Sequence, residues 1–257
     1  MKSAYEWTLL ILSLSLIVQT LEYLSLYTLF TEKGIWRWSQ LRREFRYLRF
    51  MDFALSEKTF LVLLVVRFLL SITLLFSFSF PVVFSLFITS LLIAQRFRGS
   101  FNGGSDYMTT IILSALSVAA FFQTEKVMTG VLWYIAFQSV LSYFLAGLVK
   151  IRQPLWRKGQ ALTAFIHSPN YQCPSLIKAM LDKKEMALIA SWCVMLGQLL
   201  FPLALFLPEP YVLAAISVAF LFHLNNVWLF GLNRFLLAWA ATYPAIYFVA
   251  KSLSNSP

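Results

Sequence analysis

Long apolar runs separated by short polar or basic segments make up nearly all of this chain. A helix needs about 20 mainly apolar residues to cross the hydrocarbon core of a bilayer. Apolar runs near this length or longer occur at 7–30, 59–77, 80–95, 107–123, 130–149, 187–207 and 211–250. The last is long enough for two helices separated near 223–226, or for one kinked helix with a tail. The pattern predicts an all-α fold, a polytopic integral membrane helical bundle with seven to eight transmembrane helices.

Residues 36–50, WRWSQLRREFRYLRF, interleave arginines with aromatic and aliphatic residues. The apolar residues Trp38, Leu41, Phe45 and Leu48 follow a spacing of three and four, which is typical of an amphipathic helix. Basic segments with interleaved aromatics also occur in nucleic-acid binders. The close flanking spans favour a helix that lies in the membrane interface.

Composition supports the membrane class. The 257 residues are 60% hydrophobic and only 12% charged, whereas soluble domains carry about 25% charged residues. The net charge of +10 fits a partner of anionic membrane lipid, because the basic residues alternate with apolar runs. No zinc-finger, P-loop or RNA-binding motif is present, so we expect no nucleic-acid partner. Cys173 and Cys193 form no C-x-x-C pair, and we expect no structural disulfide.

The placement of lysine and arginine predicts the orientation. Of the 21 such residues, sixteen fall within 31–58, 96–98 and 150–184. These segments share one side if the helices alternate, so the positive-inside rule places them in the cytoplasm and the N-terminus outside. We expect a single membrane domain over 1–257. It would have a cytoplasmic amphipathic segment at 31–58 and a cytoplasmic loop or re-entrant segment at 150–186, broken at Ser-Pro-Asn and Cys-Pro.

Ionisable groups within apolar runs cost energy to bury, so they mark partners or cavities. Such groups are Glu22, Arg67, Asp106, Lys150 and His223. Each has a purely structural explanation. Glu22 and Arg67 would pair across helices, and Asp106 would be a helix cap or first-turn acid. Lys150 would be an anchor that reaches the lipid headgroups.

The last apolar run offers the densest polar cluster. His223 is followed by Asn225 and Asn226, with Arg234 further on. His223 is either a core histidine bonded to a carbonyl or part of a polar pocket. The two histidines, His167 and His223, show no metal-ligand spacing, so we expect no metal site. If the protein is an enzyme, lysine, histidine and amides favour proton transfer, because burial disfavours the charged form of a lysine and makes it a base.

Three segments resemble one family. The segment YFLAGLVKIRQPLWRKGQAL at 143–162 resembles the Tyr-Phe-x-Ala-Gly-x-x-Lys…Trp-x-x-Gly motif of the HTTM superfamily, with one extra residue between lysine and tryptophan. FNGGSDYMTTIILSALS resembles the Asn-Gly-Gly-Asp helix start of bacterial members, and FHLNNVWLFGLNRF resembles a Phe-His-x-x-Asn helix. This superfamily includes the membrane domain of vitamin K-dependent gamma-carboxylase and small bacterial relatives.

The resemblance implies a quinol-linked enzyme or maturation factor of the bacterial inner membrane that modifies a peptide or small substrate. Lys150 would be the base and His223 a second catalytic residue. The cofactor would be a reduced quinone similar to vitamin K or menaquinone, without metal. The residues expected to contact it are Asn225, Asn226, Trp156, Tyr143, Arg67 and Asp106. A gamma-carboxylase-like reaction is the activity that the resemblance suggests.

Two functions of other classes stay open. The first is a non-catalytic membrane subunit that docks a protein partner through the basic segments 36–50 and 150–185. The second is a transporter, which the lack of repeat symmetry and of paired broken helices disfavours.

Overall fold

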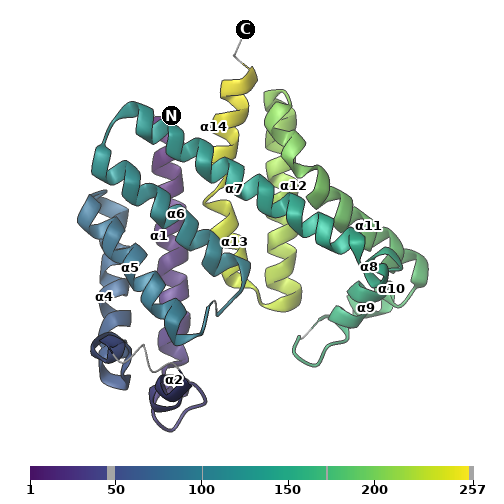
Figure 1. Cartoon of the computed structure of the whole chain (residues 1–257). Helices are drawn as coiled ribbons and strands as arrows, with labels where there is room; N and C mark the ends of the chain where they lie inside the picture. The colour runs from purple at the N-terminus through teal and green to yellow at the C-terminus, as the bar shows by residue number, and fades with distance from the viewer. Residues whose placement is uncertain (45–49, 100, 172, 255–257) are drawn as a thin grey trace. The chain divides into compact units, whose positions relative to one another are not determined.

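The computed structural model describes residues 1–44, 50–99, 101–171 and 173–254 (Figure 1), and these residues form helices and turns without a strand. Contacts between Cα atoms divide the chain into two compact units, Met1–Val131 and Leu132–Pro257. Each unit is described by itself below.

Four long helices build the first unit. Along the chain, α1 packs against α4, α4 against α5, and α5 against α6. The elements of this unit are α1 (Lys2–Ser25), η1 (Tyr27–Phe30), α2 (Trp38–Glu44), α3 (Asp52–Leu55), α4 (Glu57–Phe76), α5 (Phe80–Arg96), α6 (Gly104–Phe122) and the start of α7 (Glu125–Arg152).

The second unit alternates long and short helices. Its elements are the remainder of α7, α8 (Pro154–Arg157), α9 (Gln160–Ile166), α10 (Ser175–Leu181), α11 (Lys184–Leu200), η3 (Phe201–Phe206), α12 (Glu209–Phe230), α13 (Asn233–Ala240) and α14 (Tyr243–Ser254). The segment 150–186 thus holds three short helices. The gap between α9 and α10 contains Ser168–Asn170 and Pro174, where the sequence predicted a break.

Six described helices are long and apolar enough to cross a membrane. They are 2–25, 57–76, 104–122, 125–152, 184–206 and 209–230. α5 is apolar but has 17 residues, or about 26 Å of helix, slightly less than the ~30 Å hydrocarbon core. The structure therefore supports a multi-pass membrane protein. The predicted count of seven to eight spans is confirmed only as far as these six helices.

The division of the last apolar run differs from the prediction. α12 continues through 223–226 and ends at Phe230, because Gly231 adopts a left-handed conformation with φ of +67°. Glycine tolerates this conformation and commonly ends helices. The expected separation near 223–226 is therefore wrong. The polar residues at 223–226 point from an unbroken helix, and two short helices, α13 and α14, follow.

A buried arginine organises the centre of the first unit. Arg67, in the middle of α4, is 2% exposed. Its guanidinium donates to the hydroxyls of Thr20 at 3.2 Å and Ser90 at 2.6 Å. A third bond reaches Gln19 Oε1 at 3.2 Å, and Gln19 Nε2 donates to Thr109 at 2.9 Å. Because a cation within a span needs such partners, this network joins α1, α4, α5 and α6.

Two structural interpretations of polar residues concern the same unit. Asp106 lies in the first turn of α6, where its Oδ2 accepts from the backbone N–H of Asn102 at 2.8 Å. This agrees with the first-turn role that the helix dipole favours. The pairing of Glu22 with Arg67 stays a prediction.

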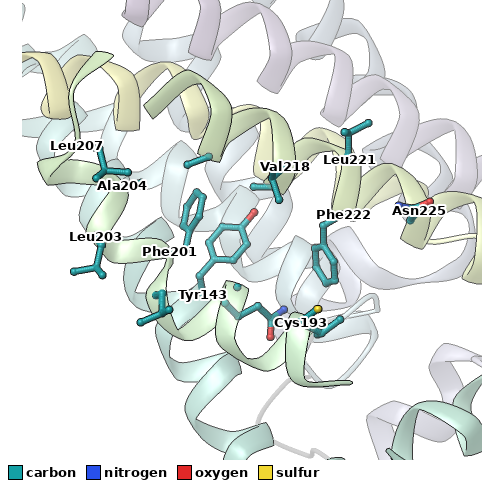
Figure 2. A pocket seen from close by; sticks show the side chains of 16 residues that line it. Tyr143, Cys193, Phe201, Leu203, Ala204, Leu207, Val218, Leu221, Phe222 and Asn225 are labelled. Atoms are coloured by element: carbon teal, nitrogen blue, oxygen red, sulfur yellow. The ribbon is translucent and has the colours of Figure 1, made fainter. Parts of the chain in front are cut away.

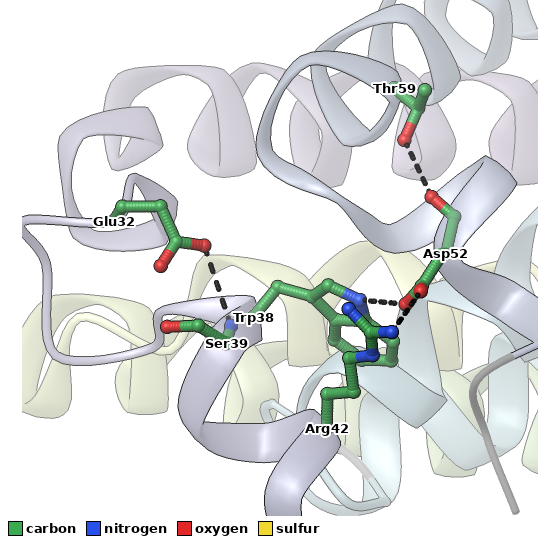
Figure 3. Close-up of polar contacts among 6 residues, drawn as sticks. All are labelled: Glu32, Trp38, Ser39, Arg42, Asp52 and Thr59. Atoms are coloured by element: carbon green, nitrogen blue, oxygen red, sulfur yellow. Dashed lines mark hydrogen bonds and ion pairs between the residues drawn. The ribbon is translucent and has the colours of Figure 1, made fainter.

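The connection between α1 and α4 is held by polar contacts (Figure 3). The indole of Trp38 donates to Asp52 Oδ1 at 2.7 Å, and Arg42 pairs with Asp52 Oδ2 at 3.1 Å. Trp38 and Leu41 are buried, as the three-residue spacing predicts. Of the predicted helix 36–50, the structure shows Trp38–Glu44 as α2. Residues 45–49 lie outside the described residues, and the position of the segment in the membrane interface stays a prediction.

Two glycines let the helices of the second unit approach closely. A Cβ at Gly147 of α7 would lie 2.6 Å from the backbone nitrogen of Leu199 and 2.9 Å from the carbonyl oxygen of Met195, both in α11. A Cβ at Gly159 would lie 2.8 Å from the carbonyl carbon of Ala187. The backbone of α11 thus occupies the space that larger side chains would need.

Ser90→Ala tests the Arg67 network. The substitution removes an acceptor of a buried cation, so we expect a loss of about 1.5 kcal/mol in unfolding free energy, near the upper limit for hydrogen bonds in membrane helices. Ser85→Ala on the same helix is the control, expected within about 0.5 kcal/mol of wild type. Unfolding in detergent measures both, and equal effects would contradict the role of the network.

Gly147→Ala tests the contact between α7 and α11. The new methyl group would overlap backbone atoms that cannot rotate away, so we expect a loss of about 2 kcal/mol or more. Gly197→Ala is the matched control, because nothing lies within 4 Å of its added Cβ. It should leave the melting temperature unchanged or raise it, since alanine favours a helix by about 1 kcal/mol. The reverse order of melting temperatures would disprove the close approach.

Candidate functional site

A cavity of about 600 Å³ lies within the second unit. Its walls come from α7, the segment 154–181, α11, α12 and α13. Most of the lining is aromatic or aliphatic, and the polar groups are few. Those polar or hydrogen-bonding residues are Ser142, Tyr143, Lys150, Trp156, Tyr171, Gln198, His223, Asn225, Asn226 and Trp239. A mainly apolar cavity with a few converging polar groups is the usual form of a small-molecule site.

Lys150 is fixed at one part of this lining. Its Nζ donates to Gln198 Oε1 at 3.0 Å and to the carbonyl oxygen of Ala146 at 3.3 Å. The ring of Trp156 lies 5.4 Å from Nζ, within the range of a cation–π contact. Because Gly147 brings α11 close, Gln198 reaches the amine. The ammonium group thus has protein partners, in contrast to an anchor that only reaches the headgroups.

His223 lies in a chain of hydrogen bonds. Its Nε2 is 2.7 Å from the hydroxyl of Tyr143, which is 3.1 Å from the hydroxyl of Tyr243. The imidazole is 4% exposed and stacks on Trp239 with centroids 5.6 Å apart and planes 11° from parallel. His223 Nε2 thus bonds to a tyrosine hydroxyl, whereas one of the two predictions had it bond to a carbonyl.

Two buried nitrogens in this lining have no hydrogen-bond partner among the described residues. They are His223 Nδ1 and Trp239 Nε1. Buried polar atoms are normally paired, because an unpaired group loses its water without compensation. Both residues line the cavity. A bound molecule with oxygen atoms would supply the missing partners.

A second cavity, of about 670 Å³, adjoins the first (Figure 2). The two share Tyr143, Val194, Gln198, Phe222 and Asn225 in their linings. η3 and α12 supply most of the remaining wall, which is aliphatic. Leu203 and Val218 in this wall are exposed. The cavity is therefore an apolar groove open at the surface of the second unit.

The structure brings most of the sequence-predicted site residues together. Six line the 600 Å³ cavity: Lys150, His223, Asn225, Asn226, Trp156 and Tyr143. The other two, Arg67 and Asp106, belong to the first unit and are not among its lining residues. Arg67 bonds to three neutral side chains, and Asp106 lies at a helix start. The catalytic and cofactor-binding roles stay predictions.

Three residues of the site were missed from the sequence. Gln198 carried a signal, because it is a polar residue within the apolar run 187–207. Tyr243 and Trp239 carried none, because aromatic residues are frequent throughout this chain. Only the packing of α13 and α14 brings them to His223.

Comparison with known proteins places the chain in a family. No characterised protein and no solved structure matched the chain. A protein-family comparison matches residues 112–251 to the HTTM domain. This range contains every polar residue named above in the lining of the 600 Å³ cavity, hereafter the Lys150 cavity. Because the match covers more than half of the chain, this protein belongs to the HTTM domain family.

Proposed function

We propose that this integral membrane HTTM protein binds a reduced quinone in the Lys150 cavity and uses Lys150 as a base to modify a peptide or small substrate. The observation that carries the proposal is that Lys150 lines one apolar cavity together with His223 and Trp239, each of which has a buried ring nitrogen without a partner among the described residues. When bound, a reduced quinone supplies an acidic hydroxyl and two electrons for reaction with oxygen.

The lining fits such a molecule in shape and polarity. A flat ring packs well against aromatic side chains, and Trp156, Phe165, Phe235 and Trp239 line the cavity. The two oxygens of the ring need hydrogen-bonding groups on separate parts of the wall. Lys150 would serve one and His223 the other, with Asn225 and Asn226 beside them.

Lys150 is arranged to accept a proton. A neutral amine donates two hydrogen bonds and keeps one lone pair. Nζ donates to Ala146 O and Gln198 Oε1, so its lone pair would be available to a hydroxyl in the cavity. Once protonated, the ammonium keeps both bonds, and the nearby face of Trp156 attracts its charge.

His223 is arranged to exchange a proton at its other nitrogen. If Tyr143 donates to Nε2, then Nδ1 carries the proton and acts as a donor. If Nε2 donates to Tyr143, then Nδ1 is an acceptor, and the Tyr143 hydroxyl turns toward Tyr243. The chain of hydroxyls therefore keeps Nε2 paired in either state of Nδ1.

The orientation that we propose for this site is derived from the positive-inside rule. The basic segments at 31–58, 96–98 and 150–184 would face the cytoplasm of a bacterial inner membrane. Lys150, at the end of α7, would then act near the cytoplasmic surface. The N-terminus would lie outside.

Quinone retention tests the binding site. Wild-type protein purified in mild detergent should retain an isoprenoid quinone, measured by extraction and mass spectrometry. Lys150→Met/Gln198→Leu removes both partners of one hydrogen bond, so neither is left unpaired. We expect about fivefold less quinone, because a hydrogen bond between neutral groups contributes about 1 kcal/mol.

Lys158→Met, in the same basic segment but outside the cavity lining, is the control and should retain quinone. Equal retention in all three proteins would reject Lys150 as a binding residue. Phospholipid alone with a stoichiometric protein partner would favour the docking subunit instead.

Lys150→Arg separates binding from base catalysis. Arginine keeps the positive charge and its hydrogen bonds but remains protonated. We expect quinone retention within a fewfold of wild type. Oxygen-dependent consumption of reduced menaquinone, followed chromatographically, should fall by about 100-fold or more, the usual contribution of a general base. Wild-type consumption by this variant would show that Lys150 acts only as a cation.

A further inference from the structure

A second candidate site lies in the first unit and shares no lining residue with the Lys150 cavity. A cavity of about 230 Å³ is lined by Ile35, Trp36, Arg37, Gln40, Leu41, Arg96, Phe97 and Arg98. Three of these eight residues are arginines and none is acidic. The volume is several times the ~30 Å³ that one water molecule occupies in the liquid. The cavity therefore has room for a phosphate group.

Arg96 is the buried cation of this site. It is 0% exposed, and its guanidinium donates to the carbonyl oxygens of Leu55 at 2.9 Å and Phe30 at 2.5 Å. Trp38 and Phe60 hold it through cation–π contacts of 5.5 and 5.1 Å. Its Nε has no hydrogen-bond partner among the described residues. A buried, unpaired donor of a charged group favours an anion nearby.

The other two arginines lie at the surface. Arg37 is exposed, and its Nε donates to Gln40 Oε1 at 3.3 Å. Arg98 is exposed just after the end of α5. The cavity thus runs from two exposed cations to a buried one. This arrangement suits the several oxygens of a phosphate, for which arginine is the preferred partner.

Two acids influence the charge without lining the cavity. Glu32 and Glu57 attract the charge of Arg96. Glu57 accepts from the backbone N–H of Glu32 at 2.8 Å, and Glu32 accepts from the backbone N–H of Ser39 at 3.4 Å (Figure 3). Both carboxylates are therefore engaged by backbone groups. The three arginines are among the described residues that line the cavity, and Glu32 and Glu57 are not.

From this arrangement we propose that the arginine cavity binds the phosphate of an anionic phospholipid. Arg96 is the last residue of the apolar helix α5, so the site lies where that helix leaves the hydrocarbon. Ile35 in the lining is 71% exposed, and Trp36 stacks within a cluster of Phe30, Phe97 and Phe101. An aromatic and aliphatic rim beside arginines matches a headgroup joined to acyl chains.

Native mass spectrometry of the full chain in nonionic detergent tests the proposal. Phosphatidylglycerol and phosphatidylcholine are titrated separately, and one phosphatidylglycerol should bind at least tenfold more tightly. Arg37→Gln/Arg98→Gln leaves the structural Arg96 in place. It should weaken that binding about 25-fold, since each arginine near an anionic headgroup contributes about fivefold.

Lys33→Gln/Arg43→Gln is the matched control. It removes the same charge from exposed positions of the same segment that do not line the cavity, so it should keep wild-type affinity. Equal loss in both pairs would overturn the site in favour of general surface charge. Displacement of the lipid by millimolar inorganic phosphate would overturn the lipid assignment and identify a free phosphate as the ligand. Circular dichroism confirms that both pairs are folded.

Discussion

At Gly147 the backbones of α7 and α11 lie so close that no Cβ fits between them. Side chains that would otherwise be separated by a layer of packing can then bond directly. Lys150, one turn after Gly147, reaches Gln198 of α11. The Lys150–Gln198 bond depends on this approach, because a wider spacing would leave Gln198 Oε1 without the amine and Lys150 with only the Ala146 carbonyl of its own helix. Small residues at helix contacts commonly have this role in membrane proteins.

The Arg67 network and the residues around His223 hold buried polar groups differently. In the first, the guanidinium of Arg67 has three partners from two other helices, and Gln19 extends the network to α6. In the second, His223 and Trp239 line a cavity, and each has a buried ring nitrogen, Nδ1 and Nε1, without a partner among the described residues. A satisfied network stabilises the helix packing, whereas unpaired groups beside a cavity favour ligand binding. The contrast argues for a structural Arg67 and a functional His223.

Much of the fold was readable from the sequence, because lipid restricts the possible structures to helices that satisfy their own backbone. The first six apolar runs therefore predicted the ends of six helical segments to within five residues. The end of α12 was harder to predict. The polar residues 223–226 suggested a break, yet asparagine and histidine continue a helix when a cavity receives their side chains, and the left-handed Gly231 ends it. Sequence patterns indicate polar positions and do not say what receives them.

The candidate site likewise combines residues that share a face within one helix with residues that only the packing of helices brings together. Tyr143, Ala146 and Lys150 lie three and four residues apart, so they share one face of α7, and His223 and Asn226 share one face of α12. A helical period carries this information within a single segment, although it was the family resemblance that named Tyr143, Lys150, His223 and Asn226 from the sequence. The contributions of Gln198 and Tyr243 depend on which helices meet. The position of Lys150 needs both parts: the local spacing presents the amine to the cavity, and the packing of α11 supplies the acceptor that holds it.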